Sequence, residues 1–286
     1  MDEKDFEIIS DLARTCNISR TSERLFTTQS AITKRLQRIE DDLQIQLFIR
    51  SKIGLQPTPA LEGLMPRLRD AMEAVARMKD YAASCSGEIS GTLRLGVSVN
   101  YARYRLPEVL KDFMACYPRV DIQIKANRSI NVYRDLMNGE TSFAIVRGEY
   151  PWRSGDLVLS EDQHCLVRNP AHDRKDLNKL TFIARESDAG YMSELAAWMT
   201  EQGLHSSRSE LIINDVETIL TLVDQGLGWS VLPGICLKRS HGIAEPIRFK
   251  DGRSFSRKTH ILYRADYFAL PQARAFAEVA KRHELL

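Results

Sequence analysis

The sequence is poor in cysteine, has almost no net charge and lacks long apolar runs. Its five cysteines are scattered over 286 residues without a C-x-x-C pair, which excludes a disulfide framework and a zinc ribbon and is typical of a reducing compartment. No apolar run approaches the length of a transmembrane helix, and the acidic first residues lack the apolar core of a signal peptide. We therefore expect a cytoplasmic protein without membrane contact.

Motifs of catalysis and metal binding are also missing. The chain has no G-x-S-x-G, H-E-x-x-H, G-x-x-x-x-G-K-[ST] or G-x-G-x-x-G pattern, and these patterns build nucleophiles, metal sites and phosphate-binding loops. Its six histidines are not spaced as metal ligands. We therefore expect no enzymatic activity, no metal and no cofactor.

Positive charge is concentrated near the amino terminus. Forty basic and 38 acidic residues leave a net charge of only +2, which excludes nucleic-acid binding over the whole surface. Between residues 13 and 58, however, eight basic residues stand against four acidic ones. Any contact with nucleic acid is therefore predicted in this segment.

Residues 1–58 have the pattern of a winged helix-turn-helix. After a first amphipathic helix, Ser19 can cap a short second helix. Thr27 or Thr28 then caps a third helix, from about residue 29 to residue 41, which has one apolar and one polar, basic face. Two helices joined by a short turn in this way are typical of DNA-binding domains.

The third helix and the segment after it supply the predicted DNA contacts. Segments 47–50 and 51–55 indicate a two-stranded wing that turns at Gly54. Amides and hydroxyls suit base edges, whereas lysine and arginine suit phosphates. On this basis the predicted contacts are Thr28, Gln29, Ser30, Thr33, Lys34, Arg35, Arg38, Arg50 and Lys52. The alternative is a helix face that is merely solvated.

Residues 59–86 predict a long linker helix with an apolar seam at spacings of three and four. Pro59 suits a first helical position, and Pro66 predicts a bend. We expect the seam to pair with a second copy of the chain, and the alternative is packing on its own domain. The predicted dimerisation residues are Leu61, Leu64, Leu68, Ala71, Val75 and Met78, and Cys85 ends the seam.

The remaining chain, residues 91–286, predicts an α/β domain of two lobes. A linker over 86–91 contains two glycines and two serines. Strands and helices then alternate twice, which implies parallel sheets with right-handed crossovers. We place lobe I at about 91–161 and 266–286, and lobe II at about 162–265.

Polar residues follow the predicted strands of both lobes, where ligands bind in sheets of this kind. Hydroxyls, amides and arginines that converge there suit a small carboxylate. The predicted effector-binding residues are Ser98, Asn100, Arg128, Ser129, Arg147 and Asn214. Taken singly, Ser98 and Asn214 can equally be helix caps, and Arg147 can equally form a surface salt bridge.

The whole chain resembles the LysR-type transcriptional regulators. The resemblance is carried by residues 22–36 (SERLFTTQSAITKRL), by the Leu47-Phe48-Ile49-Arg50 wing and by Thr58-Pro59-Ala60. Further matches are 106–107, 117–118 and the Gly226-Leu227-Gly228 turn with 232–233. The chain departs from the family pattern at Thr21-Ser22, where two alanines are usual, at Ser30, where proline is usual, and at Leu61, where glycine is usual.

This resemblance implies a function and an assembly. It implies a winged helix-turn-helix, a linker helix and an effector domain like periplasmic binding proteins. Gln29, Ser30, Thr33 and Lys34 would then meet the major groove and Arg50 would make the wing contact, while Ser98, Asn100, Ser129 and Arg147 would line the effector cleft. The protein would be a homotetramer on double-stranded promoter DNA, with an anionic small-molecule effector that shifts lobe closure.

Two other classes of protein compete with this interpretation. In the first, the chain binds a small molecule and its amino-terminal helices serve assembly only, so that no duplex is bound with salt-dependent affinity. In the second, the two-lobed domain is an enzyme, which requires a nucleophile or base that the sequence does not offer. Binding to promoter DNA discriminates the regulator from both.

Overall fold

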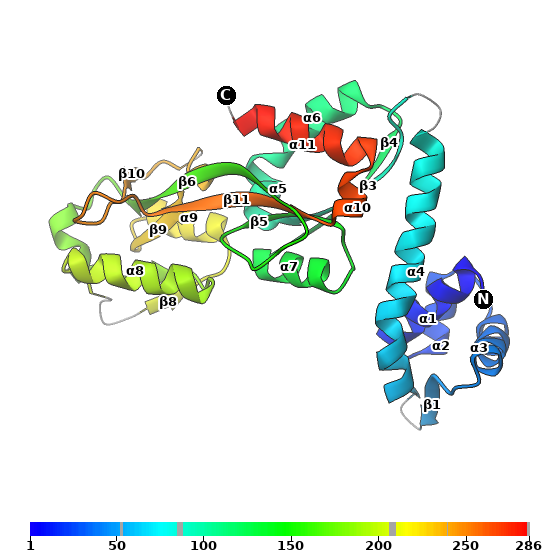
Figure 1. Ribbon diagram of the computed structural model, residues 1–286. Helices are drawn as coiled ribbons and strands as arrows, with labels where there is room; N and C mark the ends of the chain where they lie inside the picture. Colours follow the sequence, from blue (N-terminus) through cyan, green and yellow to red (C-terminus); the bar gives the residue numbers. More distant parts are fainter. Residues whose placement is uncertain (52–53, 85–87, 206–209, 239, 285–286) are drawn as a thin grey trace. The chain divides into compact units, whose positions relative to one another are not determined.

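The computed structural model describes residues 1–51, 54–84, 88–205, 210–238 and 240–284. The chain divides into two compact units, 1–92 and 93–286, except for the turn at 137–140. Helices dominate the first unit, and one mixed sheet with helices builds the second (Figure 1). The predicted fold class is therefore confirmed.

The amino-terminal unit is a winged helix-turn-helix followed by a long helix. Its elements are α1 (Glu3–Thr15), α2 (Ile18–Arg24), α3 (Gln29–Leu43), β1 (Phe48–Ser51), β2 (Gly54–Pro57) and α4 (Pro59–Ser84). The cap of α3 is Thr28, whose hydroxyl accepts a hydrogen bond from the Ala31 amide. The cap of α2 is Asn17 rather than the predicted Ser19. Asn17 wins because its side chain accepts the Arg20 amide at 3.0 Å.

Thr21 and Ser22 of α2 stand where the family pattern usually has two alanines. Thr21 is fully buried, and its hydroxyl lies 2.7 Å from that of Thr15. The Ser22 hydroxyl donates to the Ser19 carbonyl at 2.8 Å. Each buried hydroxyl therefore has a partner, which removes the cost of burying it. The departure from the family pattern at these positions is thus accommodated without a change of fold.

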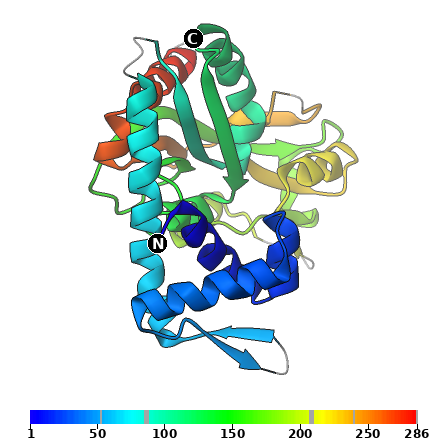
Figure 2. The same ribbon diagram turned by 90° about the vertical axis from the view of Figure 1, so that its right-hand side faces the viewer.

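The wing is an antiparallel hairpin of β1 and β2, seen as the blue ribbon at the foot of Figure 2. Glu40 on α3 fixes its start, since the carboxylate accepts the amides of Leu47 and Phe48 at 2.6 and 3.0 Å. Gly54 has a φ of +121°, and a Cβ there would lie 2.9 Å from the Cys16 carbonyl, so glycine is required. The predicted contact Lys52 lies outside the described residues.

The apolar seam of α4 is divided, which corrects part of the dimerisation prediction. Leu61 and Leu68 are 1% and 4% exposed and pack with α1 and α3 in the core of their own unit, and Leu64 packs against that core. Met78, in contrast, is 65% exposed. The first half of the seam therefore serves the domain itself, because α1 covers it. Helix α4 continues through Pro66, and Cys85 lies outside the described residues.

The second unit begins with lobe I. Its first elements are β3 (Gly91–Ser98), α5 (Val99–Tyr104), α6 (Leu106–Cys116), β4 (Val120–Asn127), α7 (Ser129–Met137) and β5 (Phe143–Arg147). Parallel pairing of β3 with β5 confirms the predicted crossover order. Arg105 separates α5 from α6.

A strand that is not predicted from the sequence comes before lobe II. This strand is β6 (Asp156–Arg168), and β7 (Phe182–Ala184), α8 (Ala189–Glu201), β8 (Glu210–Ile212), α9 (Val216–Asp224), β9 (Trp229–Pro233) and β10 (Ile243–Pro246) come after it. Short 3-10 helices lie at Arg174–Lys179 and Gly234–Cys236. The chain ends with β11 (Ser256–Tyr263), α10 (Ala265–Phe268) and α11 (Pro271–Glu284), and α11 packs against α6 (Figure 1).

Two long strands join the lobes. The strand order is β4-β3-β5-β11-β6-β9-β7-β8, in which β6 pairs with β11 at one end and with β9 at the other. Residues 259–263 of β11 pair with β5 of lobe I. The chain therefore returns from lobe II to lobe I near Ser256, about ten residues before residue 265, where the end of lobe II is predicted. Because two strands cross, the loops at the strand ends of both lobes face one cleft.

Each lobe has its own apolar core. In lobe II, Trp198 and Trp229 are 1% and 0% exposed, and their indole N–H groups donate to the carbonyls of Arg248 and Leu177. In lobe I, Phe143 contacts the ring of Phe276 edge-on at 6.0 Å. Burial of aromatic side chains of this size supplies much of the stability of each lobe.

Candidate functional site

One face of α3 is free for a ligand. Ile32, Leu36 and Ile39 are buried, and they hold the helix on its domain. Outside this core Gln29, Ser30 and Lys34 are exposed, while Thr33 is half-buried. The residues predicted to meet the major groove thus lie on the face that leaves the core, and Arg50 is exposed on β1.

Arg35 holds α1 on α3. It does not face outward as the predicted phosphate contact. Its guanidinium donates to Asp5 and to Asp2, and its side chain is only 24% exposed. Arg38 also donates to Asp5, at 3.0 Å, but remains 55% exposed. Arg35 therefore neutralises a fully buried carboxylate, whereas Arg38 keeps surface that can meet a phosphate.

Asp5 is the electrostatic centre of this contact. Burial by itself raises the pKa of Asp5, but hydrogen bonds from Arg35 and from the Asp2 amide outweigh it, so the pKa is lowered. The charged form is thus the stable one in the folded domain. Arg35 is unavailable for DNA as long as this buried charge needs it.

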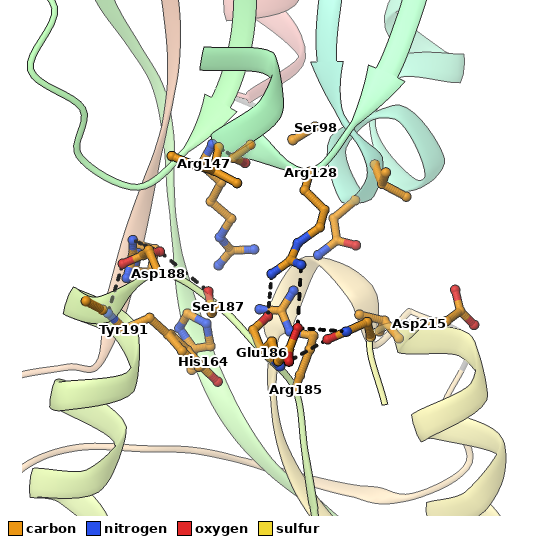
Figure 3. A pocket seen from close by; sticks show the side chains of 18 of the residues that line it. Ser98, Arg128, Arg147, His164, Arg185, Glu186, Ser187, Asp188, Tyr191 and Asp215 are labelled. Carbon is orange, nitrogen blue, oxygen red and sulfur yellow. Dashed lines mark hydrogen bonds and ion pairs between the residues drawn. The ribbon is translucent and has the colours of Figure 1, made fainter. Parts of the chain in front are cut away.

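The second candidate site is a cleft of about 380 Å³ between the lobes. Its walls are the starts of α5 and α7 in lobe I and of α8 and α9 in lobe II (Figure 3). All six residues predicted to bind an effector line it: Ser98, Asn100, Arg128, Ser129, Arg147 and Asn214. Tertiary structure therefore brings together residues that are spread over 117 positions of the sequence.

Several of these residues also hold the cleft in shape. The Ser129 hydroxyl accepts the Arg147 amide at 3.1 Å, and Arg147 pairs with Asp162 at 2.6 Å. Across the mouth, Arg128 lies 3.6 Å from the Glu186 carboxylate, to which the Asn214 amide donates at 3.1 Å. Arg128 comes from lobe I and Glu186 from lobe II, so this ion pair links the lobes (Figure 3).

Other residues of the cleft are not found from the sequence. They are chiefly His164, Arg185, Asp188, Tyr191 and Arg257. His164 lies on β6 and Arg257 on β11, the two crossing strands. The middle of β6 and the start of β11 are polar, which hides the strand pattern. Arg185 directly follows the β7 strand. This position after a strand is the one sequence signal for Arg185 as a cleft residue.

Two buried titratable side chains of the cleft have shifted pKa values. Burial lowers the pKa of His164 well below its usual range, and the charges of Arg147, Arg185 and Arg257 lower it further. Burial raises the pKa of Tyr191, whose hydroxyl donates to the Val231 carbonyl at 3.2 Å. Both side chains are therefore neutral near pH 7.

The family of the chain is shown by comparison with known proteins. Residues 4–61 match the family model "Bacterial regulatory helix-turn-helix protein, lysR family", and residues 86–284 match "LysR substrate binding domain". The chain belongs to the LysR family of transcriptional regulators, which confirms the resemblance seen in the sequence. It is a DNA-binding regulator with an effector-binding domain.

Relatives span the full chain. An uncharacterized HTH-type transcriptional regulator of Bacillus subtilis, YraN, is 30% identical over 287 residues and covers 100% of this chain and 99% of its own. The regulator CzcR of Bacillus cereus is 25% identical, over 82% of this chain and 80% of its own. None of the described helices is long and apolar enough to cross a membrane.

Solved structures share the fold. Full-length OxyR from Pseudomonas aeruginosa gives a TM-score of 0.70 at 20% identity, and covers 100% of this chain and 95% of its own. CbnR in complex with its target DNA gives 0.66 at 17% identity, over 99% of this chain and 100% of its own. At these identities the likeness establishes the architecture, and the ligands of the site must be argued from its own residues.

Proposed function

We propose that the protein binds promoter DNA through α3 and the β1–β2 wing, and that a small carboxylate in the cleft modulates this binding. The observation that carries the DNA contact is the exposed polar face of α3. Gln29 and Thr33 lie four residues apart on it, and both suit base edges. Ser30, Lys34, Arg38 and Arg50 suit phosphates, and Lys52 is proposed from the sequence alone.

The charge of the cleft supports an anionic effector. Four arginines and three carboxylates line it, so its wall carries one more positive than negative charge. Hydroxyls and amides from Ser98, Asn100 and Ser129 provide hydrogen bonds beside the arginines. This combination suits a carboxylate, which accepts several hydrogen bonds and neutralises a guanidinium.

Assembly connects the two sites in this proposal. We infer a dimer, paired through the exposed part of α4 around Met78, and a tetramer built from two such dimers. Two recognition helices held at fixed spacing read two half-sites of one operator. An effector that favours one lobe arrangement then shifts the assembly between DNA-bound states, because it binds those states with different affinity.

The test is binding of the full-length protein to the intergenic DNA upstream of its own gene. Affinity is measured against a scrambled duplex over a salt series, and footprinting follows on the same samples. We expect a protected region with two or more half-sites and an affinity that falls with salt. Equal affinity for both duplexes would reduce the amino-terminal unit to an unspecific basic patch and favour a ligand-binding protein instead.

A further inference from the structure

Acidic and basic side chains around the cleft are paired, with one exception. The pairs are Arg128 with Glu186 at 3.6 Å, Arg147 with Asp162 at 2.6 Å, and Arg257 with Asp188 at 2.7 Å. The remaining carboxylate, Asp215, pairs with Arg103. Arg185 has no carboxylate partner among the described residues, and its buried Nε has no hydrogen-bond partner there. The wall of lobe II therefore carries one uncompensated cation.

A second unsatisfied group lies beside this cation. His164 is 1% exposed, and its ring stacks on Phe255 at 4.7 Å and contacts Tyr191 at 5.1 Å. Its buried Nδ1 has no hydrogen-bond partner within the described parts of the chain. A buried polar atom without a partner is costly, so a hydrogen-bond partner for this atom would be stabilising.

Arg147 completes the arrangement from lobe I. It extends from the end of β5 toward His164 and Arg185, which lie on the opposite wall (Figure 3). Its side chain is 12% exposed, and its Nε is also buried without a partner in the described chain. Three nitrogen atoms without partners in the described chain thus come from β5, from β6 and from the residue directly after β7, and all three residues line the same cleft.

We propose that Arg185, His164 and Arg147 form a subsite for a single carboxylate group of the effector. The proposal rests on the proposed function and specifies where the effector's charge is held. One uncompensated guanidinium matches one negative charge, and a carboxylate has the lone pairs to accept from both arginines and from an imidazole N–H. Arg185 and His164 are thus the lobe II residues that recognise the anion.

Binding at this subsite takes up a proton. His164 by itself is neutral, because burial and three arginines lower its pKa. The nearby acids Asp162 and Asp188 are already engaged by Arg147 and Arg257, and Tyr191 is neutral. A bound carboxylate adds one negative charge and favours the imidazolium. Affinity is therefore expected to rise as the pH falls toward the lowered pKa of free His164.

The first experiment uses propionate as the probe and propionamide as its neutral isostere. The full-length protein is titrated to about 100 mM of each at matched ionic strength, and the shift of Tm is measured. We expect propionate, and not propionamide, to raise Tm. The shift should disappear in Arg185→Gln, remain partly in Arg185→Lys, and be unchanged in Arg282→Gln, which alters an exposed arginine of α11. A full propionate shift in Arg185→Gln, or none in the wild type, overturns the subsite.

The second experiment measures the proton. Calorimetry of propionate binding to the wild type, in two buffers of different ionisation enthalpy, should show proton uptake. His164→Gln should bind propionate with an affinity that no longer depends on pH. Absence of uptake in the wild type, a result that requires no variant to fold, contradicts the role of His164. Operator binding is measured in parallel, so that loss of the subsite is distinguished from loss of the DNA-binding function.

A separate observation concerns the turn before α3. Phe26 has a φ of +48° and is 97% exposed. The Thr27 amide donates to the Ser22 carbonyl at 2.9 Å, which makes Phe26 the left-handed residue that ends α2, a position that favours glycine. Both the backbone and the exposed ring are thus unfavourable in the free domain, so neither explains why phenylalanine stands there.

We infer that Phe26 is an apolar base contact at the amino-terminal end of the recognition helix. It lies two residues before Thr28, the cap of α3, and an aromatic ring there suits a thymine methyl group in the major groove. Phe26→Gly should raise Tm and weaken operator binding about tenfold. The control is Gln44→Gly, which also relieves a left-handed residue, φ +56°, and should leave operator affinity unchanged. Wild-type operator affinity in Phe26→Gly overturns the inference.

Discussion

At the residue scale, the amino-terminal unit separates side chains that build the domain from those that remain free. Asp5 is fully buried and accepts from Arg35 and Arg38, so two cations of α3 serve an anion of α1. Gln29 and Lys34 of the same helix are exposed. Substitution of the first group should therefore lower stability, whereas substitution of the second should lower affinity for DNA.

Substitution of Gln29 should weaken specific DNA binding. Gln29→Ala removes a bidentate amide from the base edge and should lower operator affinity by about 1–3 kcal/mol, without a change in dimerisation. The matched control is Gln123→Ala, which alters an exposed glutamine of β4 in the effector unit and should have no effect. Fluorescence anisotropy with the operator and a scrambled duplex measures both. Equal losses in the two variants would exclude Gln29 as a base reader.

Arg50 should behave differently from Gln29. Arg50→Ala removes a phosphate contact of the wing and should weaken binding to every duplex. The slope of log affinity against log salt should fall by about one unit. A salt series with operator and scrambled DNA gives this slope. A change in sequence preference would instead show that Arg50 reads bases.

Loss of Arg35 should destabilise the amino-terminal unit. Arg35→Met leaves the buried charge of Asp5 with Arg38 alone, and should lower the free energy of unfolding by about 3 kcal/mol. Arg20→Met, on the exposed side of α2, is the control. Denaturant unfolding followed by circular dichroism measures both. If Arg35→Met is as stable as the wild type, the contact of α1 with α3 does not depend on this pair.

The Asp5–Arg35 pair also predicts that the stability of the amino-terminal unit falls at acid pH. The pKa of Asp5 is lower in the folded state than in the unfolded chain, so its stabilisation is fully present above the unfolded value near 4. It is lost as the pH falls through the folded value. Asp5→Asn should therefore flatten the loss of stability below about pH 4. An unchanged pH profile in this variant would assign the acid sensitivity to other carboxylates.

At the element scale, α4 illustrates the limit of pattern analysis. Its heptad spacing is regular, yet Leu61 and Leu68 are covered by their own domain and Met78 is exposed. A sequence repeat fixes which residues share a face, but it does not state what lies against that face. Only the position of α1 settles this for the first half of the helix.

The two halves of α4 should respond differently to substitution. Leu68→Ala should lower the free energy of unfolding by about 2–5 kcal/mol, since it opens a cavity in the domain core. Met78→Glu should leave the fold intact and weaken dimerisation, because a charge then faces the partner helix. Unfolding and sedimentation are measured on both variants. A monomeric but stable Leu68→Ala protein would restore the pairing role of the first half.

Strand β6 shows why part of the cleft escapes prediction. Its thirteen residues run from lobe I to lobe II, and the side of the strand that is covered changes on the way. The middle, around 161–163, is polar and only partly buried. A period of two therefore fails over its length, and His164 is hidden with it. The helices, in contrast, are predicted within a few residues, because their caps and apolar faces are local.

At the scale of the whole molecule, the lobes of the effector unit are linked by exposed charges. Arg128 and Glu186 are 49% and 58% exposed, and such pairs contribute little to stability. The pair joins residues of the two lobes at the cleft. We therefore expect the link to matter for ligand binding rather than for folding.

Reversal of this pair should reveal the link. Arg128→Glu places two negative charges across the mouth and should weaken propionate binding with little change in Tm. The double variant Arg128→Glu/Glu186→Arg restores the attraction and should recover much of the affinity. Calorimetry on the three proteins measures the coupling. If the double variant binds no better than the single one, Arg128 contacts the effector itself rather than Glu186.

The family, the order of domains, the helix predicted to meet DNA and six residues of the cleft can be read from the sequence alone. These follow from local caps, helix periodicity and the placement of polar residues after strands, all of which depend on neighbours in the chain. Only the tertiary structure decided that Arg35 serves Asp5, that Leu68 faces α1, and that His164 and Arg185 join Arg147. Each of these depends on contacts between distant segments, and burial and charge are settled where such segments meet.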